Sequence, residues 1–137
     1  MYTSNFANVQ KIIEAGLRPV AISIGLPKMY KGEHEFRLAP TWAMLKMPRE
    51  EYDRLFLKKL ASLDPVQLYQ SLGEDAVLLC FEKHNDWCHR RLVAEWFESE
   101  LGIVVPEFGF DRSETLPYCQ CGTKKKDDDS DIQGSLF

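Results

Sequence analysis

Apolar residues follow two different spacings along the chain, and these spacings predict strands and helices that alternate. Residues 76–82, "AVLLCFE", are almost continuously apolar, as expected for a central strand that is covered on both faces. Residues 19–25, "PVAISIG", form a second short run bounded by Pro19 and Gly25, and residues 103–108, "IVVPEF", form a third. We expect a buried strand in each of these three runs.

Four other segments carry apolar residues at every third or fourth position, which predicts amphipathic helices. These segments are residues 4–16, 48–63, 64–73 and 87–102. In the first of them, Ser4 or Asn5 is the expected N-cap and Gly16 the expected end. Strands that alternate with helices predict an α/β domain with a largely parallel sheet.

Two stretches lack a regular spacing. Residues 26–47 form a long loop that is too rich in apolar residues for disorder, and loops of this length usually have a function. From about Leu116 onward the core pattern fades, and the chain becomes charged in "KKKDDDSDIQGSLF". We therefore expect an α/β domain over residues 1–115 and a flexible charged tail over residues 116–137.

The composition is that of an ordinary soluble protein, and it limits the possible partners. The chain has 137 residues, of which 45% are hydrophobic and 28% charged, enough for one domain with a real core. Its net charge of −4 gives no overall attraction to nucleic acid or an anionic membrane, although it permits a local basic patch. No segment is apolar enough to cross a bilayer, and residues 1–10 do not resemble a signal peptide. We expect a cytoplasmic protein whose four cysteines are thiols, ligands or nucleophiles rather than disulfides.

Reactive side chains gather where the predicted central strand ends and the last predicted helix begins. The strand ends in Cys80 and Glu82, and the first turn of the helix carries Cys88, His89 and Arg90. In open α/β sheets, ligands bind at this edge, and the amides of a helix start attract anions. The helix start and His89 should lower the pKa of the Cys88 thiol, while Glu82 could accept a proton or orient Arg90 or His89.

Packing offers a simpler interpretation of some of these residues. Cys80 lies inside an apolar strand and is expected in the core, because free cysteine is often buried. Glu82 and Arg90 could form a structural ion pair. Arg91 is expected to be a solvated helix residue, and His84 a loop residue without a role.

Three segments resemble a known family, the domain-of-unknown-function 488 family. They are "YTSNF", "ISIGLPKMYKGEHEFRLAPTW" and "LLCFEKHNDWCHRRLVAEW", within residues 2–106. The family's hallmark is a strand that ends in Cys-x-Glu, followed by Cys-His-Arg at a helix start, and this chain matches it in full. The resemblance implies a Rossmann-like three-layer α/β fold and supplies no reaction. It also implies that further residues line the pocket: Ser4, Asn5, Pro27, Tyr30 and Lys31.

Three chemistries compete for this cluster. Zinc binding is disfavoured because the chain has no Cys-x-x-Cys pair, and Cys119 and Cys121 are read as incidental thiols, although a redox or metal role for them is not excluded. A phosphatase loop is excluded, because no arginine follows either Cys80 or Cys88 by six positions. We therefore expect no metal and no cofactor.

Recognition or cleavage of a nucleotide, DNA or sugar-phosphate ligand suits the predicted anion site best. In this hypothesis Arg90 holds phosphate, Glu82 is the base or nucleophile, and Tyr30 or Trp42 offers a stacking face. Cys88 and His89 complete the expected catalytic group, and Ser4, Asn5, Tyr30 and Lys31 the ligand-binding group. The alternative is a non-catalytic module that senses a nucleotide or a DNA end.

The last five residues, "QGSLF", resemble the peptide with which bacterial DNA-processing proteins dock on the DNA sliding clamp. Gln133, Leu136 and Phe137 fit that motif, whereas Gly134 departs from it. Two large apolar side chains at the end of a charged tail could each contribute about 1.5–3 kcal/mol when buried in a partner. We expect the clamp as a partner of the tail.

Overall fold

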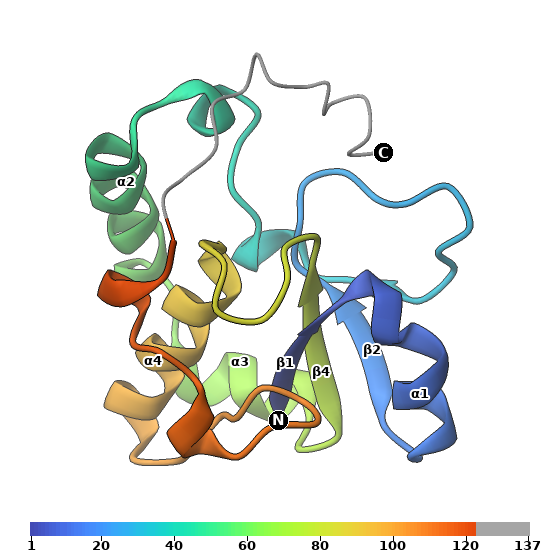
Figure 1. The fold of residues 1–137 in the computed structure, drawn as a ribbon. Coiled ribbons are helices and arrows are strands. Elements are labelled where there is room, and N and C mark those ends of the chain that lie inside the picture. The colour runs from blue at the N-terminus through green and yellow to red at the C-terminus, as the bar shows by residue number, and fades with distance from the viewer. Residues whose placement is uncertain (123–137) are drawn as a thin grey trace.

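Four parallel strands form one sheet in the order β1-β4-β2-β3, and helices cover both of its faces (Figure 1). The structure is a computed structural model, and it describes residues 1–122. The strands are β1 (Tyr2–Asn5), β2 (Arg18–Ala21), β3 (Glu33–His34) and β4 (Ala76–Cys80). The helices are α1 (Val9–Glu14), α2 (Arg49–Ala61), α3 (Pro65–Leu72) and α4 (His89–Leu101). Short 3-10 segments cover Phe6–Asn8, Phe36–Leu38, Ala43–Lys46, Arg112–Glu114 and Tyr118–Gln120.

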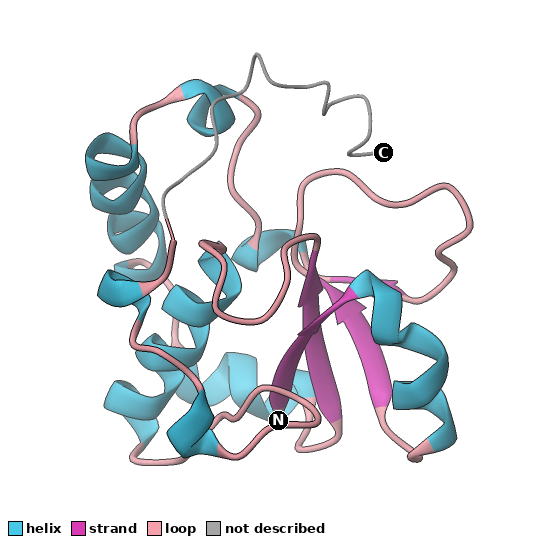
Figure 2. Cartoon of the chain, in the orientation of Figure 1, coloured by secondary structure: helices cyan, strands magenta, loops and turns pink. Residues whose placement is uncertain are grey.

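The central strand β4 separates two apolar cores, as its unbroken run of apolar residues requires. Val77 and Leu79 pack with Ile12 of α1 on one face. Leu78 packs on the other face with residues of α2, α3 and α4, such as Phe56. The result is a Rossmann-like three-layer α/β fold, which confirms the predicted fold class (Figure 2).

The strand register determines which residues meet at the carboxyl edge of the sheet. Asn5 of β1 pairs with Cys80 of β4, and Ala21 of β2 pairs with Leu79. Because the three strands are parallel, their carboxyl ends lie side by side, and the loops that follow them gather at one edge.

Local sequence signals account for the helices that were predicted correctly. Pro48 precedes α2, and Asp64 caps α3 by accepting hydrogen bonds from the amides of Val66 and Gln67. Gly102, with a φ of +67°, ends α4 in the left-handed conformation. These features define helix ends without help from the rest of the fold.

Two expected elements differ in the structure. Residues 4–5 do not cap a long helix: they end β1, which supplies β4 with a hydrogen-bonded neighbour, and α1 begins only at Val9. Residues 103–108 do not form a strand, and only a single bridge joins Glu107 to Thr3. Pro106 lacks an amide donor and therefore weakens any ladder at that position.

Candidate functional site

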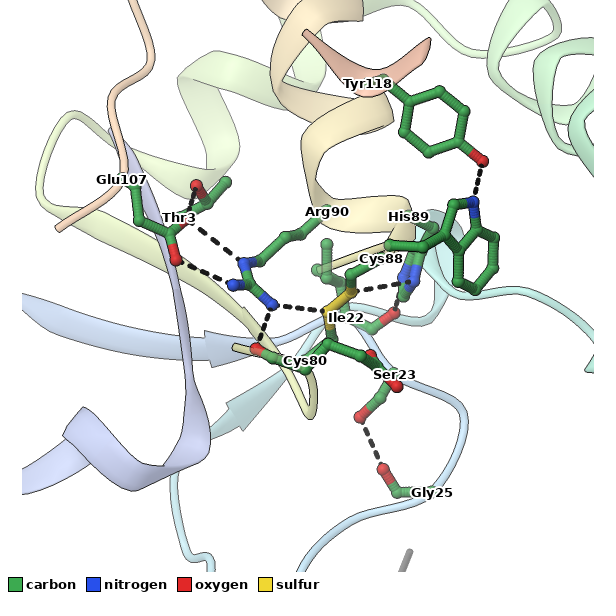
Figure 3. Close-up of a disulfide and its surroundings, with 12 residues drawn as sticks. Thr3, Ile22, Ser23, Gly25, Cys80, Cys88, His89, Arg90, Glu107 and Tyr118 are labelled. Atoms are coloured by element: carbon green, nitrogen blue, oxygen red, sulfur yellow. Dashed lines mark hydrogen bonds and ion pairs between the residues drawn. A yellow bond between two sulfur atoms is a disulfide. The ribbon is translucent and has the colours of Figure 1, made fainter. Parts of the chain in front are cut away.

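The predicted cluster lies where β4 ends and α4 begins, at the carboxyl edge of the sheet. Cys80 is the last residue of β4, and Cys88 immediately precedes α4. The two form a disulfide, and each residue is only 2% exposed (Figure 3). The expectation of a free Cys88 thiol is therefore wrong for this state of the protein. The turn of residues 81–87 brings the two sulfurs together, which sequence spacing alone does not reveal.

His89 is buried beside this disulfide and is held in one orientation. Its Nε2 donates a hydrogen bond to the carbonyl oxygen of Ile22 at 2.7 Å, and its Nδ1 lies 3.9 Å from the Sγ of Cys88. Burial lowers the pKa of His89 to about 4, so the ring is neutral near pH 7. His89 is only 5% exposed, and its ring packs edge-on against Phe56 of α2.

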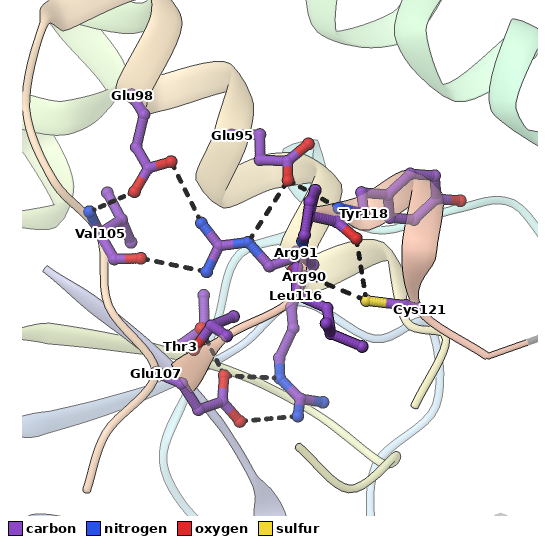
Figure 4. Close-up of polar contacts among 12 residues, drawn as sticks. Thr3, Arg90, Arg91, Glu95, Glu98, Val105, Glu107, Leu116, Tyr118 and Cys121 are labelled. Carbon is purple, nitrogen blue, oxygen red and sulfur yellow. Dashed lines mark hydrogen bonds and ion pairs between the residues drawn. The ribbon is translucent and has the colours of Figure 1, made fainter. Parts of the chain in front are cut away.

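Arg90 is buried too, and its carboxylate partner is Glu107 rather than Glu82 (Figure 4). Its Nη2 and Nε donate to the two carboxylate oxygens of Glu107 at 2.8 and 3.2 Å. Its Nη1 donates to the carbonyl oxygen of Glu82 at 2.8 Å and contacts the Sγ of Cys80 at 3.2 Å. Thr3 donates to the same carboxylate at 2.6 Å. Each nitrogen of Arg90 donates to a protein atom and the side chain is only 4% exposed, so Arg90 presents little surface for the expected phosphate contact.

Arg91 is buried as well, which contradicts its expected position on a solvated helix face. Its Nη2 lies 3.3 Å from a carboxylate oxygen of Glu98, and its Nη1 donates to the carbonyl oxygen of Val105 at 3.2 Å. Burial lowers the pKa of Arg91. Arg90 and Arg91 together fasten the segment after α4 to the helix and to β1.

The residues expected to bind ligand fall into two groups. Ser4 and Asn5 lie at the carboxyl end of β1, beside Cys80. Ser4 accepts a hydrogen bond from Asn8 at 3.0 Å, whereas the buried Oδ1 of Asn5 has no hydrogen-bond partner among residues 1–122. Such an unpaired buried acceptor is costly and uncommon in folded proteins. Asn5 is therefore the predicted residue that is best prepared for a ligand.

Tyr30 and Lys31 lie on the loop that follows β2, where Tyr30 is partly buried and Lys31 is exposed. The hydroxyl of Tyr30 donates to the carbonyl oxygen of Glu33 at 2.6 Å, its ring packs edge-on against Phe6, and burial raises its pKa to about 12. Lys31 is exposed on the loop that follows β2. The structure thus joins Ser4 and Asn5 to the cluster and leaves Lys31 at the surface.

A small cavity lies beside the disulfide. Its volume is about 10 Å³, which is room for one water molecule. Cys88, Arg90, Glu107 and Cys121 are among the residues that line it. A nucleotide does not fit this cavity, so a ligand of that size has to contact the loops around it.

The segment from residue 26 to residue 47 presents exposed apolar side chains on those loops. Met29 is 81% exposed, Phe36 60% and Trp42 58%. The segment leaves the carboxyl end of β2 and leads, past the short strand β3, to α2 (Figure 1). Lys28, Lys31 and Lys46 are exposed along the same segment. Large apolar side chains and lysines are therefore both exposed on the segment that follows the carboxyl end of β2.

Sequence reasoning missed Glu107 and Thr3, which complete the Arg90 network. The sequence predicts a strand at Glu107 and no strand at Thr3, whereas Thr3 lies in β1 and Glu107 forms only a single bridge to it. The signal available for Glu107 is an acidic residue directly after a short apolar run, and it identifies no partner. The expected clamp-binding residues, Gln133, Leu136 and Phe137, lie outside the described residues.

Comparisons with protein-family models, with curated proteins and with solved structures found no significant match. The family resemblance of the sequence therefore stays a prediction. Among residues 1–122, no helix has both the length and the apolar character that a membrane crossing requires.

Proposed function

We propose that the protein binds a nucleotide or a short stretch of single-stranded DNA at the carboxyl edge of its sheet and acts on it. The observation that carries this proposal is the exposure of Met29, Phe36 and Trp42 on a segment that is also rich in lysine. Bases stack on exposed aromatic rings, and lysines follow the phosphate backbone. Ligands of parallel α/β sheets bind at this edge.

The charge of this segment differs in sign from that of the chain. Residues 26–47 contain four lysines or arginines and two glutamates, a net charge of +2 in a chain whose net charge is −4. Arg37 pairs with Glu35 at 2.8 Å, so the exposed lysines are the cations that remain for a ligand. A local positive patch on an acidic protein directs a phosphate ligand to one place.

Asn5 and Glu82 take the specific roles in this proposal. The unpaired Oδ1 of Asn5 accepts a hydrogen bond from an amino or hydroxyl group of the ligand. Glu82 follows β4 on the loop, with its backbone carbonyl fixed by Arg90, and its carboxylate is the candidate base or nucleophile. Arg90 then positions this loop and does not contact the ligand.

Binding is tested with a fluorescent single-stranded oligonucleotide and with mononucleotides. Reversing the charges of Lys28 and Lys31, as Lys28→Glu with Lys31→Glu, should weaken binding and reduce its dependence on salt. The matched control is Lys11→Glu with Lys58→Glu, which reverses two exposed charges outside the segment. If both double variants lose the same amount of binding affinity, the effect comes from the net charge of the protein and not from a site on this segment.

Turnover separates an enzyme from a non-catalytic module. The full chain is incubated with the oligonucleotide or with nucleotides, and the products are identified by mass spectrometry. For an enzyme, Glu82→Gln keeps binding and loses product formation. Binding without product in the wild type would favour the alternative, a module that senses a nucleotide or a DNA end.

We also propose that the sliding clamp recruits the protein through residues 133–137. The support is the match of Gln133, Leu136 and Phe137 to the docking motif. Deleting these five residues should abolish co-elution with the clamp and leave oligonucleotide binding unchanged. A chain with Leu136→Ala and Phe137→Ala is the minimal version of the same test, and retained co-elution would dismiss the proposal.

A further inference from the structure

Three metal-binding side chains converge at the end of β4. The sulfurs of Cys80 and Cys88 and a ring nitrogen of His89 all lie within 4.8 Å of one another. We propose that, when the Cys80–Cys88 disulfide is reduced, both thiolates and His89 Nδ1 bind one zinc ion. Two thiolates and an imidazole are a donor set that selects zinc over magnesium or calcium. This inference is independent of the proposed nucleotide function.

The orientation of His89 suits a metal ligand. Because its Nε2 donates to the carbonyl of Ile22, the proton lies on Nε2 and the lone pair of Nδ1 points toward Cys88. A hydrogen bond from the second ring nitrogen to a carbonyl is the usual support of a metal-binding histidine. The separation of 3.9 Å between Nδ1 and the Cys88 sulfur is close to the separation, about 3.6 Å, of two ligands on a tetrahedral zinc.

The two cysteines are spaced for an ion between them. Their Cα atoms are 7.2 Å apart, whereas disulfides usually span about 4.4–6.8 Å. On a tetrahedral zinc the sulfurs lie about 3.8 Å apart, so a wide backbone separation is an advantage. Arg90 also places its Nη1 3.2 Å from the Cys80 sulfur, so the position of this sulfur is fixed by a direct contact.

Cys88 also lines a cavity of about 10 Å³ with room for one water molecule, although Cys80 and His89 are not among the residues that line it. Cys121 lines it as well, but its sulfur contacts the carbonyl oxygens of Leu116 and Pro117 at 3.9 and 3.5 Å and does not belong to the converging group. Zinc prefers four ligands, so an ion held by these three side chains would take a water molecule as its fourth ligand.

Reduction of the Cys80–Cys88 disulfide requires a reductant, and a cellular dithiol can serve as one. The dithiol supplies two electrons and two protons, so the bond between the sulfurs of Cys80 and Cys88 breaks, two thiols form, and the dithiol becomes a disulfide. Zinc then displaces the two protons and forms two bonds to sulfur. A cellular disulfide that accepts two electrons and two protons from the medium, and becomes a dithiol, re-forms the bond between the two sulfurs and releases the ion, so the redox state of the pair controls the metal.

The first test uses cobalt as a coloured substitute for zinc in the full chain. After reduction with a phosphine, one equivalent of Co²⁺ should give thiolate-to-cobalt absorption and the intense visible bands of a tetrahedral site, both absent in oxidised protein. Cys88→Ser and Cys80→Ser should lose the thiolate band, whereas Cys119→Ser and Cys121→Ser keep it. No thiolate band in reduced wild type, its persistence in Cys88→Ser or its loss in Cys121→Ser would each overturn the proposal.

The second test needs no variant and therefore does not depend on variant folding. X-ray absorption at the zinc edge of the reduced, zinc-loaded wild type should show two sulfur neighbours at about 2.3 Å and two nitrogen or oxygen neighbours. Four sulfurs, or none, would contradict the assigned ligands. Oligonucleotide binding is measured separately, so a failure here says nothing about the proposed function.

Discussion

The start of α4 and the segment of residues 26–47 use their charges in opposite ways. At the start of α4, Arg90 and Arg91 are buried, and their charges are offset by Glu107 and Glu98. Along residues 26–47, lysines and large apolar side chains are exposed. The two arginines thus brace the interior of the protein, whereas residues 26–47 present side chains that a large ligand can reach.

Breaking the buried ion pair between Arg90 and Glu107 should have the largest effect on stability. Glu107→Ala leaves Arg90 buried without its carboxylate and should lower the free energy of unfolding by about 3–5 kcal/mol. Denaturant unfolding measures the change. The double variant Arg90→Met with Glu107→Leu is the control, since it removes both charges and should recover much of the loss. If Glu107→Ala lowers the free energy of unfolding by less than about 1 kcal/mol, the ion pair of Arg90 and Glu107 contributes no more than an exposed ion pair does.

The next effect is a dependence of stability on pH that originates in His89. Its pKa of about 4 in the folded protein is below the ordinary 6.5, so the unfolded chain binds the proton first as the pH falls. Stability is full above about pH 6.5 and decreases toward pH 4, by about 3 kcal/mol. His89→Gln should remove this part of the pH dependence when unfolding is compared at pH 7 and pH 4. An unchanged difference between the two pH values would assign the effect to other groups.

Reduction of the disulfide should have a somewhat smaller effect. Cys80 and Cys88 are 8 positions apart, and closing so short a loop stabilises a protein by about 2–3 kcal/mol. Cys88→Ser, measured with a chelator present, should lose this amount in denaturant unfolding. Cys119→Ser changes an exposed cysteine and should have no effect. Zinc is then added to the reduced wild type and to Cys88→Ser. A gain in the free energy of unfolding in the wild type alone would distinguish the metal-bound state from the dithiol without metal.

The elements that the sequence predicts well carry their signals locally. Pro48 directly precedes α2, and α3 begins at Pro65 with Asp64 as its N-cap. The strand β4 is a run of five apolar residues. By contrast, β1 has only four residues and exists because it pairs with β4, more than seventy positions away. A strand that depends on so distant a partner leaves no periodic pattern, so the sequence wrongly predicts a helix start at Ser4 and Asn5.

The same distinction explains the candidate site. The sequence brings Cys88, His89 and Arg90 together because they are adjacent along the chain. It does not identify Glu107 as the partner of Arg90, or Cys80 as the partner of Cys88, because the folded backbone determines both pairings. Residue types therefore predicted that these side chains gather at one edge of the sheet, while the contacts differ from the roles expected for Cys88 and Arg90.

Trp42→Ala is expected to have the smallest effect on stability. It also tests most directly whether residues 26–47, unlike the start of α4, form a surface that binds a ligand. The side chain is 58% exposed, so its loss should change the free energy of unfolding by no more than about 0.5 kcal/mol. If a base stacks on the ring, binding of the oligonucleotide weakens by about 1–3 kcal/mol, or roughly 5- to 150-fold. Val104→Ala, which removes an exposed apolar side chain outside the segment, is the matched control and should leave binding unchanged. Unaltered affinity in Trp42→Ala would mean that the exposed apolar residues of this segment serve another purpose.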